Sequence, residues 1–208
     1  MVIELLGIPG CGKSTYVRNF IKENKDALNP LELYLYDDLR FKQNMNKIKL
    51  LFLFFLSHPI KSIELTIAFN RVKFKSKFTK LKMFTYLFSI VSIYSLCITK
   101  YSQNLIILDE GINQVIWGIS YNSFDSEQSI YKLQKLLFPY FADEIIFFRV
   151  PKYVIKERLL ARTNSGGSEL QKDILKNEEL IDKSISLVEI IAKRVNELST
   201  IKLVVIDF

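Results

Sequence analysis

Gly7-Ile8-Pro9-Gly10-Cys11-Gly12-Lys13-Ser14 follows an apolar run, residues 2–6, and precedes a segment with helical spacing. The stretch fits the pattern G-x-x-x-x-G-K-[ST]. Its glycines let the backbone curl, so that successive N–H groups and the next helix N-terminus point at one anion. Lys13 adds a positive charge and Ser14 a hydroxyl group for Mg²⁺, neither of which a plain glycine turn needs. The stretch therefore predicts a phosphate-binding loop for a nucleoside triphosphate.

The residues expected to contact the phosphates lie within this loop and at the start of the helix after it. They are Gly7, Pro9, Gly10, Cys11, Gly12, Lys13, Ser14 and Thr15.

Length and composition predict one domain, residues 1–208, because 208 residues with 49% hydrophobic content can bury a single sizeable core. The net charge of +7 suits an anionic partner, which nucleotide, nucleic acid or acidic lipid could supply. Only two cysteines occur, and a disulfide at Cys11 would distort the phosphate-binding loop. We therefore expect free thiols and a cytoplasmic protein.

Four further apolar runs predict buried parallel strands, at residues 31–36, 105–108, 144–150 and 202–207. Helical spacing predicts helices from Lys13 onward and over residues 127–141, 151–162 and 169–198. Alternating strands and helices with right-handed crossovers predict an α/β fold. We expect a doubly wound sheet of about five parallel strands with helices on both faces and a lid. Ligands bind at the carboxyl ends of the strands in such folds.

The segment 41–101 is predicted to be a helical insert on the substrate side of the domain. Its uncharged run, residues 83–99, is shorter than the about 20 apolar residues of a membrane span and contains several hydroxyl groups, which favours a buried helix. Residues 71–82 interleave cations with aromatic rings. This segment is interpreted as a solvated connector. The alternatives are contact with a membrane surface, a phosphorylated substrate or nucleic acid, of which nucleic acid is not favoured. A second copy of the chain, in a homodimer, is a further candidate partner.

Asp109 and Glu110 directly follow the apolar run 105–108. An acid at the end of a buried strand suits Mg²⁺ coordination through water, which is the role predicted for Asp109. The alternative is a cap on the following helix. Glu110 could polarise a water, contact substrate or remain exposed.

Asp37, Asp38 and Arg40 follow the second predicted strand. Asp37 is a candidate base for the proton of an attacking hydroxyl group, and Arg40 a candidate clamp for a substrate anion. A helix cap with a solvated arginine explains the same residues equally well.

Arg158 and Arg162 lie four residues apart on one predicted helical face, before the polar stretch 163–168. We interpret residues 151–168 as a lid that brings both arginines onto the transferring phosphoryl group. Solvated arginines are the alternative.

Together, these motifs resemble the P-loop nucleoside and nucleotide kinase group, especially thymidylate-kinase-like proteins. The resemblance implies an ATP·Mg²⁺ phosphotransfer fold with a five-stranded parallel core, and it assigns the family roles to Lys13, Ser14, Asp109, Arg158 and Arg162. Asp37-Asp38-Leu39-Arg40 resembles the D-D-x-R element of P-loop kinases that phosphorylate a hydroxyl group. The Asp-Arg pair that thymidylate kinases carry after the third strand is Asp109-Glu110 here.

The leading interpretation is a kinase that moves the γ-phosphoryl group of ATP to a hydroxyl or phosphate of a small acceptor. The alternative is a P-loop ATPase that acts as a switch or motor with a basic polyanion-binding or membrane-surface face, because Asp109-Glu110 also suits hydrolytic enzymes. A third interpretation, a basic nucleic-acid or membrane binder with an idle loop, would need damage that the loop residues do not show.

Overall fold

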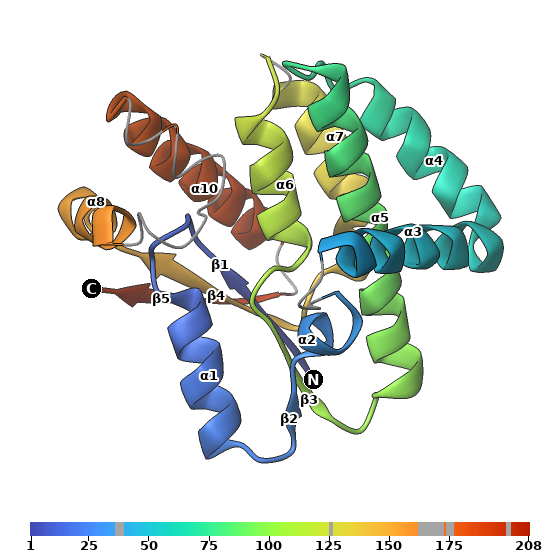
Figure 1. Cartoon of the computed structure of the whole chain (residues 1–208), viewed down its shortest axis with the longest axis horizontal. Coiled ribbons are helices and arrows are strands. Elements are labelled where there is room, and N and C mark those ends of the chain that lie inside the picture. Colours follow the sequence, from blue (N-terminus) through green and yellow to red (C-terminus); the bar gives the residue numbers. More distant parts are fainter. Residues whose placement is uncertain (36–39, 125–126, 162–172, 174–176, 199–200) are drawn as a thin grey trace.

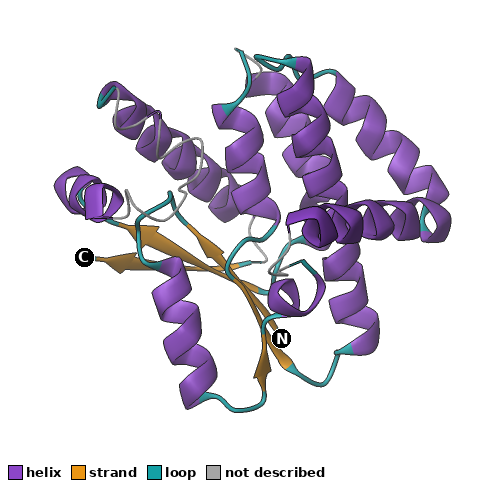
Figure 2. Cartoon of the chain, in the orientation of Figure 1, coloured by secondary structure: helices purple, strands orange, loops and turns teal. Residues whose placement is uncertain are grey.

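The computed structural model describes residues 1–35, 40–124, 127–161, 173, 177–198 and 201–208. Its five-stranded sheet is parallel throughout, in the order β2-β3-β1-β4-β5 (Figure 1, Figure 2). The strands are β1 (Val2–Leu6), β2 (Ala27–Leu28), β3 (Leu105–Leu108), β4 (Glu144–Arg149) and β5 (Lys202–Asp207).

The central strand β1 is buried along its whole length and pairs with β3 on one side and β4 on the other. Parallel strands that helices cover on both faces read as continuous apolar runs, which is why the sequence reveals them. Helix α1 lies on one face of the sheet, and α6 and α10 lie on the other (Figure 1). The predicted doubly wound α/β fold is confirmed.

The four helical ranges predicted outside the insert each contain a helix. These are α1 (Lys13–Glu23), α7 (Glu127–Leu137) with the 3₁₀ turn η1 (Phe138–Tyr140), α8 (Lys152–Ala161) and α10 (Glu179–Leu198). Helix α6 (Ile112–Tyr121), after β3, lies where no helical range was predicted.

The strand predicted at residues 31–36 is wrong. This stretch begins with helix α2 (Pro30–Tyr34), and the strand beside β3 is the two-residue β2 (Ala27–Leu28). Asn29 explains the difference, because its side chain accepts a hydrogen bond from the N–H of Leu31 at 3.2 Å and so caps the helix. Proline at the first helical position favours the same outcome. The acids that follow therefore come after a helix.

The insert consists of α3 (Arg40–Ser57), α4 (Pro59–Asn70) and α5 (Lys77–Lys100), as its helical prediction requires. Among the described residues, α5 is the one single helix long and apolar enough to cross a membrane, yet 56% of its most apolar stretch is buried inside the protein. It packs along α3 and α6. The apolar run 83–99 is thus a buried helix.

An aromatic cluster joins the three insert helices. The rings of Phe84 and Phe88 on α5 lie 4.7 Å apart, and Phe88 lies 4.9 Å from Phe55 and 5.8 Å from Phe54, both on α3. Phe69 on α4 contacts Phe84 at 5.4 Å. Offset and edge-to-face contacts of this kind add to the burial of the rings, so the cluster fixes how the insert packs.

The basic connector between α4 and α5, residues 71–76, packs partly against α6. Lys75 donates a 2.8 Å hydrogen bond to the backbone carbonyl of Tyr121, and its ammonium lies 4.9 Å from the centre of the Tyr121 ring. Phe74 forms an isolated antiparallel β-bridge with Ser123, which lies just after α6. The connector is therefore a partly packed segment rather than a wholly solvated one.

Two phenylalanines of α3 test the orientation of the insert. Phe54 is 1% exposed and Phe52 61% exposed. We expect Phe54→Ala to lower the free energy of unfolding by about 3–5 kcal/mol, because it leaves a cavity in the aromatic cluster. Phe52→Ala should change it by less than about 0.5 kcal/mol. Denaturant unfolding of both variants checks this, and equal losses would contradict the packing.

Candidate active site

The phosphate-binding loop has the backbone that its glycines predict. Gly10 and Gly12 have φ values of +91° and +109°, a region that other residues rarely adopt. A side chain at Gly7 would also come within 2.7 Å of the Cys11 sulfur. Lys13 begins α1 and folds back over the loop, where its ammonium donates hydrogen bonds to the carbonyls of Gly7 and Ile8. The loop and its lysine thus form one compact unit at the carboxyl end of β1.

Asp109 lies beside this unit because β3 pairs with β1. Burial and the adjacent charge of Glu110 raise the pKa of Asp109 to about 6, whereas the positive charge of Lys13 lowers it. Its Oδ1 atom is buried and has no hydrogen-bond partner among the described residues. A buried carboxylate oxygen without a protein donor, next to a phosphate-binding loop, fits a Mg²⁺ ion that takes its other ligands from phosphates and water.

Asn29 is a site residue that sequence reasoning missed. Its Oδ1 caps α2, while its side-chain amide lies near enough to Asp109 to lower the pKa of that carboxyl. The amide nitrogen makes no hydrogen bond of ordinary geometry to any described residue. Asn29 thus brings a polar group to the strand end that holds Asp109. The one sequence feature that could have indicated Asn29 is its position directly before Pro30, where it caps a helix.

Glu110 faces the helical insert instead of the phosphate-binding loop. Its carboxylate accepts a hydrogen bond from the hydroxyl group of Tyr86 on α5, and Lys47 on α3 lies 5.4 Å from the centre of the Tyr86 ring. Burial lowers the pKa of Lys47, against the opposing effect of the Glu110 charge. Tyr86 and Lys47 belong to no motif, so only the fold reveals this polar group between α3, α5 and the end of β3.

Glu4 is a buried charge in the central strand that sequence reasoning did not single out. Its Oε1 accepts hydrogen bonds from the backbone N–H groups of Asn113 at 2.6 Å and Gln114 at 3.1 Å, and its Oε2 accepts one from the Asn113 side chain at 3.1 Å. These donors favour the ionised form, but complete burial outweighs them and raises the pKa of Glu4 to about 7. Glu4 therefore caps the N-terminus of α6 from the neighbouring strand.

The same network reaches the phosphate-binding loop. Gln114 accepts a 3.3 Å hydrogen bond from the N–H of Gly7, and Gln134 on α7 donates one of the same length to Asn113. Gly111 lies so close to Glu4 that an added Cβ would be 2.4 Å from the carboxyl carbon. One polar network thus holds the loop and the segment 109–111 in fixed positions.

Arg158 of α8 lies against the phosphate-binding loop, and its predicted role in phosphoryl transfer stays a prediction. Its guanidinium donates hydrogen bonds to the carbonyls of Gly10 at 3.3 Å and Cys11 at 3.1 Å, and it lies 5.7 Å from the centre of the Phe208 ring. The Arg158 side chain therefore lies directly against the phosphate-binding loop.

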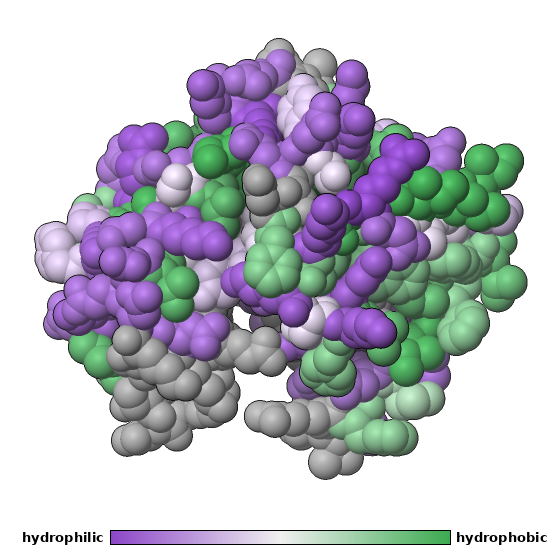
Figure 3. Space-filling model, turned by 90° about the horizontal axis from the view of Figure 1, so that it is seen from above, coloured by the Kyte–Doolittle hydropathy of each residue, from purple (hydrophilic) through white to green (hydrophobic). Residues whose placement is uncertain are grey.

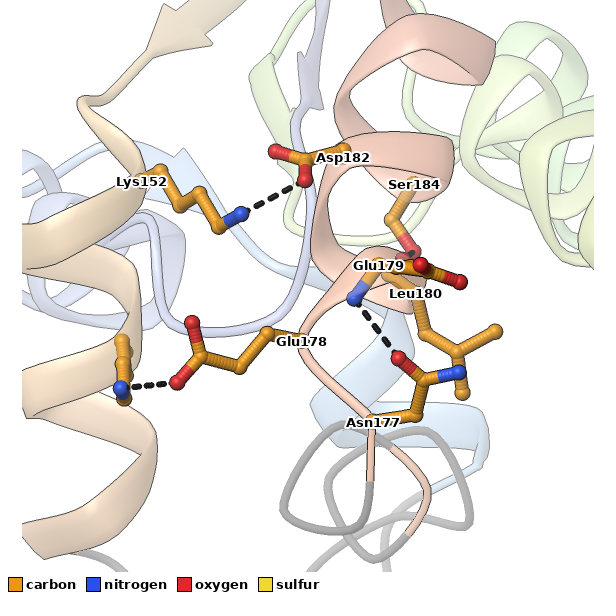
Figure 4. A network of polar contacts seen from close by, with 8 residues as sticks. Lys152, Asn177, Glu178, Glu179, Leu180, Asp182 and Ser184 are labelled. Atoms are coloured by element: carbon orange, nitrogen blue, oxygen red, sulfur yellow. Dashed lines mark hydrogen bonds and ion pairs between the residues drawn. The ribbon is translucent and has the colours of Figure 1, made fainter.

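Ion pairs attach α8 to the start of α10 (Figure 4). Lys152 contacts Asp182 at 2.6 Å, and Lys156 pairs with Glu178. Asn177 accepts a 2.9 Å hydrogen bond from the N–H of Glu179 and so caps this end of α10. Exposed ion pairs are individually weak, so these contacts orient α8 without locking it.

Several predicted site residues fall outside the described residues. Asp37, Asp38 and Arg162 lie in the ranges 36–39 and 162–172, and so does the last part of the predicted lid 151–168, residues 162–168. Arg40 begins α3, and its side chain is also outside the description. Ser14 and Thr15 are exposed on the first turn of α1. The roles of all these residues stay predictions.

Two surface cavities, of about 730 and 440 Å³, lie elsewhere, next to the connector and α7. Arg71 lines both, and Arg194 and Glu127, which form a 2.7 Å ion pair, line the larger. Neither cavity is lined by a residue of the phosphate-binding loop. They are separate from the candidate active site.

Two glycines at α6 test the network around Glu4. We expect Gly111→Ala to lower the free energy of unfolding by about 1–3 kcal/mol, because the methyl group would overlap the Glu4 carboxyl. Gly118→Ala meets only an ordinary 3.5 Å contact with Met83, and should be neutral or stabilise the helix by up to about 1 kcal/mol. Thermal and denaturant unfolding measure both, and a neutral Gly111→Ala would rule out the proposed close packing.

No protein-family profile and no curated protein matches the sequence. Among solved structures, three of deoxyadenosine kinase from M. mycoides match the fold: one with the products dCMP and dCDP, one with dATP and one with dCTP. They are 16%, 15% and 14% identical in sequence, with TM-scores of 0.54, 0.53 and 0.51. Each match covers 100% of this chain and 90%, 91% and 90% of the other chain.

The likeness to thymidylate kinases stays a prediction, because the matched structures are of a different kinase. The five parallel strands, the helices around them and the full-length match lead to one conclusion about architecture. The chain has the fold of a P-loop deoxynucleoside kinase.

Proposed function

We propose that this protein is an ATP-dependent kinase that transfers the γ-phosphoryl group to a hydroxyl group of a nucleoside-like acceptor. One observation carries the proposal: Lys13, at the start of α1, lies near enough to Asp109, after β3, to lower the pKa of that carboxyl, and the buried Asp109 Oδ1 makes no hydrogen bond of ordinary geometry to any described residue. Opposite charges in this arrangement suit a triphosphate with its metal ion. The matched deoxyadenosine kinase structures support the choice of acceptor class.

The protein groups around the phosphates have separate tasks in this proposal. The N–H groups of the loop and the ammonium of Lys13 bind the β- and γ-phosphates. Ser14 and Asp109 would hold Mg²⁺, which when bound neutralises charge on the phosphate oxygens. Arg158 adds a guanidinium that already contacts the loop carbonyls and can turn to the transferring group. Arg162 is proposed to act with it.

The acceptor side of the site is formed by the insert. Glu110 accepts a hydrogen bond from the hydroxyl group of Tyr86 on α5. We propose that the remaining lone pairs of this carboxylate accept a hydrogen bond from the acceptor's hydroxyl group. We propose Asp37 as the base and Arg40 as a clamp on the acceptor, and both assignments rest on the sequence motif.

Loss of the loop lysine should remove activity. With γ-labelled ATP and a panel of deoxynucleosides, we expect Lys13→Ala to lower kcat/KM by roughly 10²- to 10³-fold, because a charge that stabilises the transition state is lost. Lys22→Ala, in the last turn of the same helix, is the matched control and should retain full activity. ATP hydrolysis without any accepted nucleoside, sensitive to Lys13→Ala, would instead favour the switch or motor ATPase.

Arg158 should act mainly in the transition state. We expect Arg158→Ala to lower kcat by roughly 10³-fold while the Kd for ATP changes little, since a phosphoryl-transfer arginine binds the developing charge. Lys156→Ala removes a cation from the same helix that pairs with Glu178, and it should have little effect on either quantity. Calorimetry and steady-state kinetics separate the two effects, and equal losses in binding and rate would assign Arg158 to ground-state binding.

A further inference from the structure

An apolar stripe lies on the outer surface of α3. Its members recur every three or four residues, which places them on one side of the helix. They are Phe41, Met45, Ile48, Phe52 and Leu56. Helix α4 continues the pattern with Ile60, Ile63 and Ile67. We call these eight residues the α3–α4 apolar face. Hydrophobic residues gather at the side of the molecule where α3 and α4 lie (Figure 3).

The α3–α4 apolar face is not the side that packs the insert together. The opposite side of each helix supplies the buried residues, such as Phe54 on α3 and Leu65 on α4. Exposure on the outer side is highest at the bend between the helices, where Leu56 is 82% and Ile60 76% exposed. Soluble proteins rarely expose so many large apolar side chains together, and such patches mark protein or membrane contacts.

The charge around the α3–α4 apolar face favours a membrane over a second protein as the partner. Residues 40–101 contain twelve lysines and arginines but a single acid, Glu64, although the whole chain has a net charge of only +7. Glu64 is paired with Lys61 at 3.0 Å, whereas Lys42 and Lys49 are exposed beside the stripe. A second copy of the chain would bring two positively charged surfaces together. An anionic lipid surface would attract the cations and accept the apolar side chains.

We propose that the α3–α4 apolar face docks the protein on the surface of an anionic lipid bilayer. The two helices bend by 119° at their junction, so they do not form one straight span. Leu56 and Ile60 at the bend enter the boundary between headgroups and acyl chains, and Lys42 and Lys49 contact the headgroups. This surface differs from the basic segment 71–82, and the inference does not depend on the proposed kinase activity.

Vesicle flotation tests the docking directly. We expect the full-length protein to float with vesicles of phosphatidylcholine and phosphatidylglycerol, and to stay in solution with phosphatidylcholine alone. Leu56→Glu combined with Ile60→Glu should lower the partition coefficient by about a hundredfold or more, since two apolar anchors are lost. Lys42→Gln with Lys49→Gln should lower it by roughly twentyfold at low salt, since each cation near an anionic surface contributes about fivefold.

The matched control is Tyr153→Glu, which adds a charge at a side chain that is 72% exposed on α8, at the other end of the molecule (Figure 1). It should leave flotation unchanged. All substituted side chains are exposed, and circular dichroism with thermal unfolding shows whether each variant retains the fold.

A fluorescence measurement locates the contact without removing it. Trp117 is the one tryptophan of the chain and is 7% exposed. Leu56→Trp should therefore add a signal that shifts to shorter wavelength on anionic vesicles and is quenched by brominated lipids. Tyr153→Trp should show neither change.

Three results would overturn the proposal. The first is absence of flotation with the anionic vesicles. The second is equal binding to both vesicle types. The third is binding that survives Leu56→Glu with Ile60→Glu in a folded protein. Self-association in solution that these substitutions abolish, without vesicle binding, would assign the face to a second copy of the chain.

Discussion

The hydrogen bonds between Glu4 and the first turn of α6 are the constraint on which the candidate active site depends. A carboxylate that is completely buried is costly unless donors surround it, and three nitrogen donors of Asn113 and Gln114 do so here. Because Gln114 also binds the N–H of Gly7, the phosphate-binding loop and the acidic end of β3 cannot move independently. The distance between the phosphate-binding loop and the segment 109–111 is thus fixed by buried hydrogen bonds, away from solvent.

Charge is distributed unevenly over the molecule, and this asymmetry links the site to the insert. Residues 40–101 contain twelve of the 29 lysines and arginines but one of the 22 acids, while Asp109 and Glu110 follow the neighbouring strand β3. Tyr86 donates a hydrogen bond to Glu110, and Lys47 lies over the Tyr86 ring, so the insert borders the acidic end of β3. Its outer side is apolar and faces away from the sheet. One helical unit therefore presents polar groups to the acidic end of β3 and apolar groups to the surroundings of the protein.

Local patterns predicted much of the architecture. The loop 7–14, the strand 105–108 with Asp109 after it, and the strand 202–207 need only a few consecutive residues to be recognised. The prediction failed at residues 31–36, where a short apolar run suits a strand or a helix equally well. At this position, the cap by Asn29 and the proline that follows it, Pro30, stabilise a helix. The contacts of Glu4, Tyr86 and Lys47 left no such signal, because their partners are distant in sequence.

By itself, the sequence determined the fold class and the position of the phosphate-binding loop, since glycine conformation, strand periodicity and the Lys-Ser pair are local properties. Only the tertiary structure decided which polar groups converge on that loop. Burial raises the pKa of Asp109, packing aims Arg158 at the loop carbonyls, and a strand residue caps a helix more than a hundred positions away. Each of these depends on the low dielectric and close packing that form only when distant segments meet.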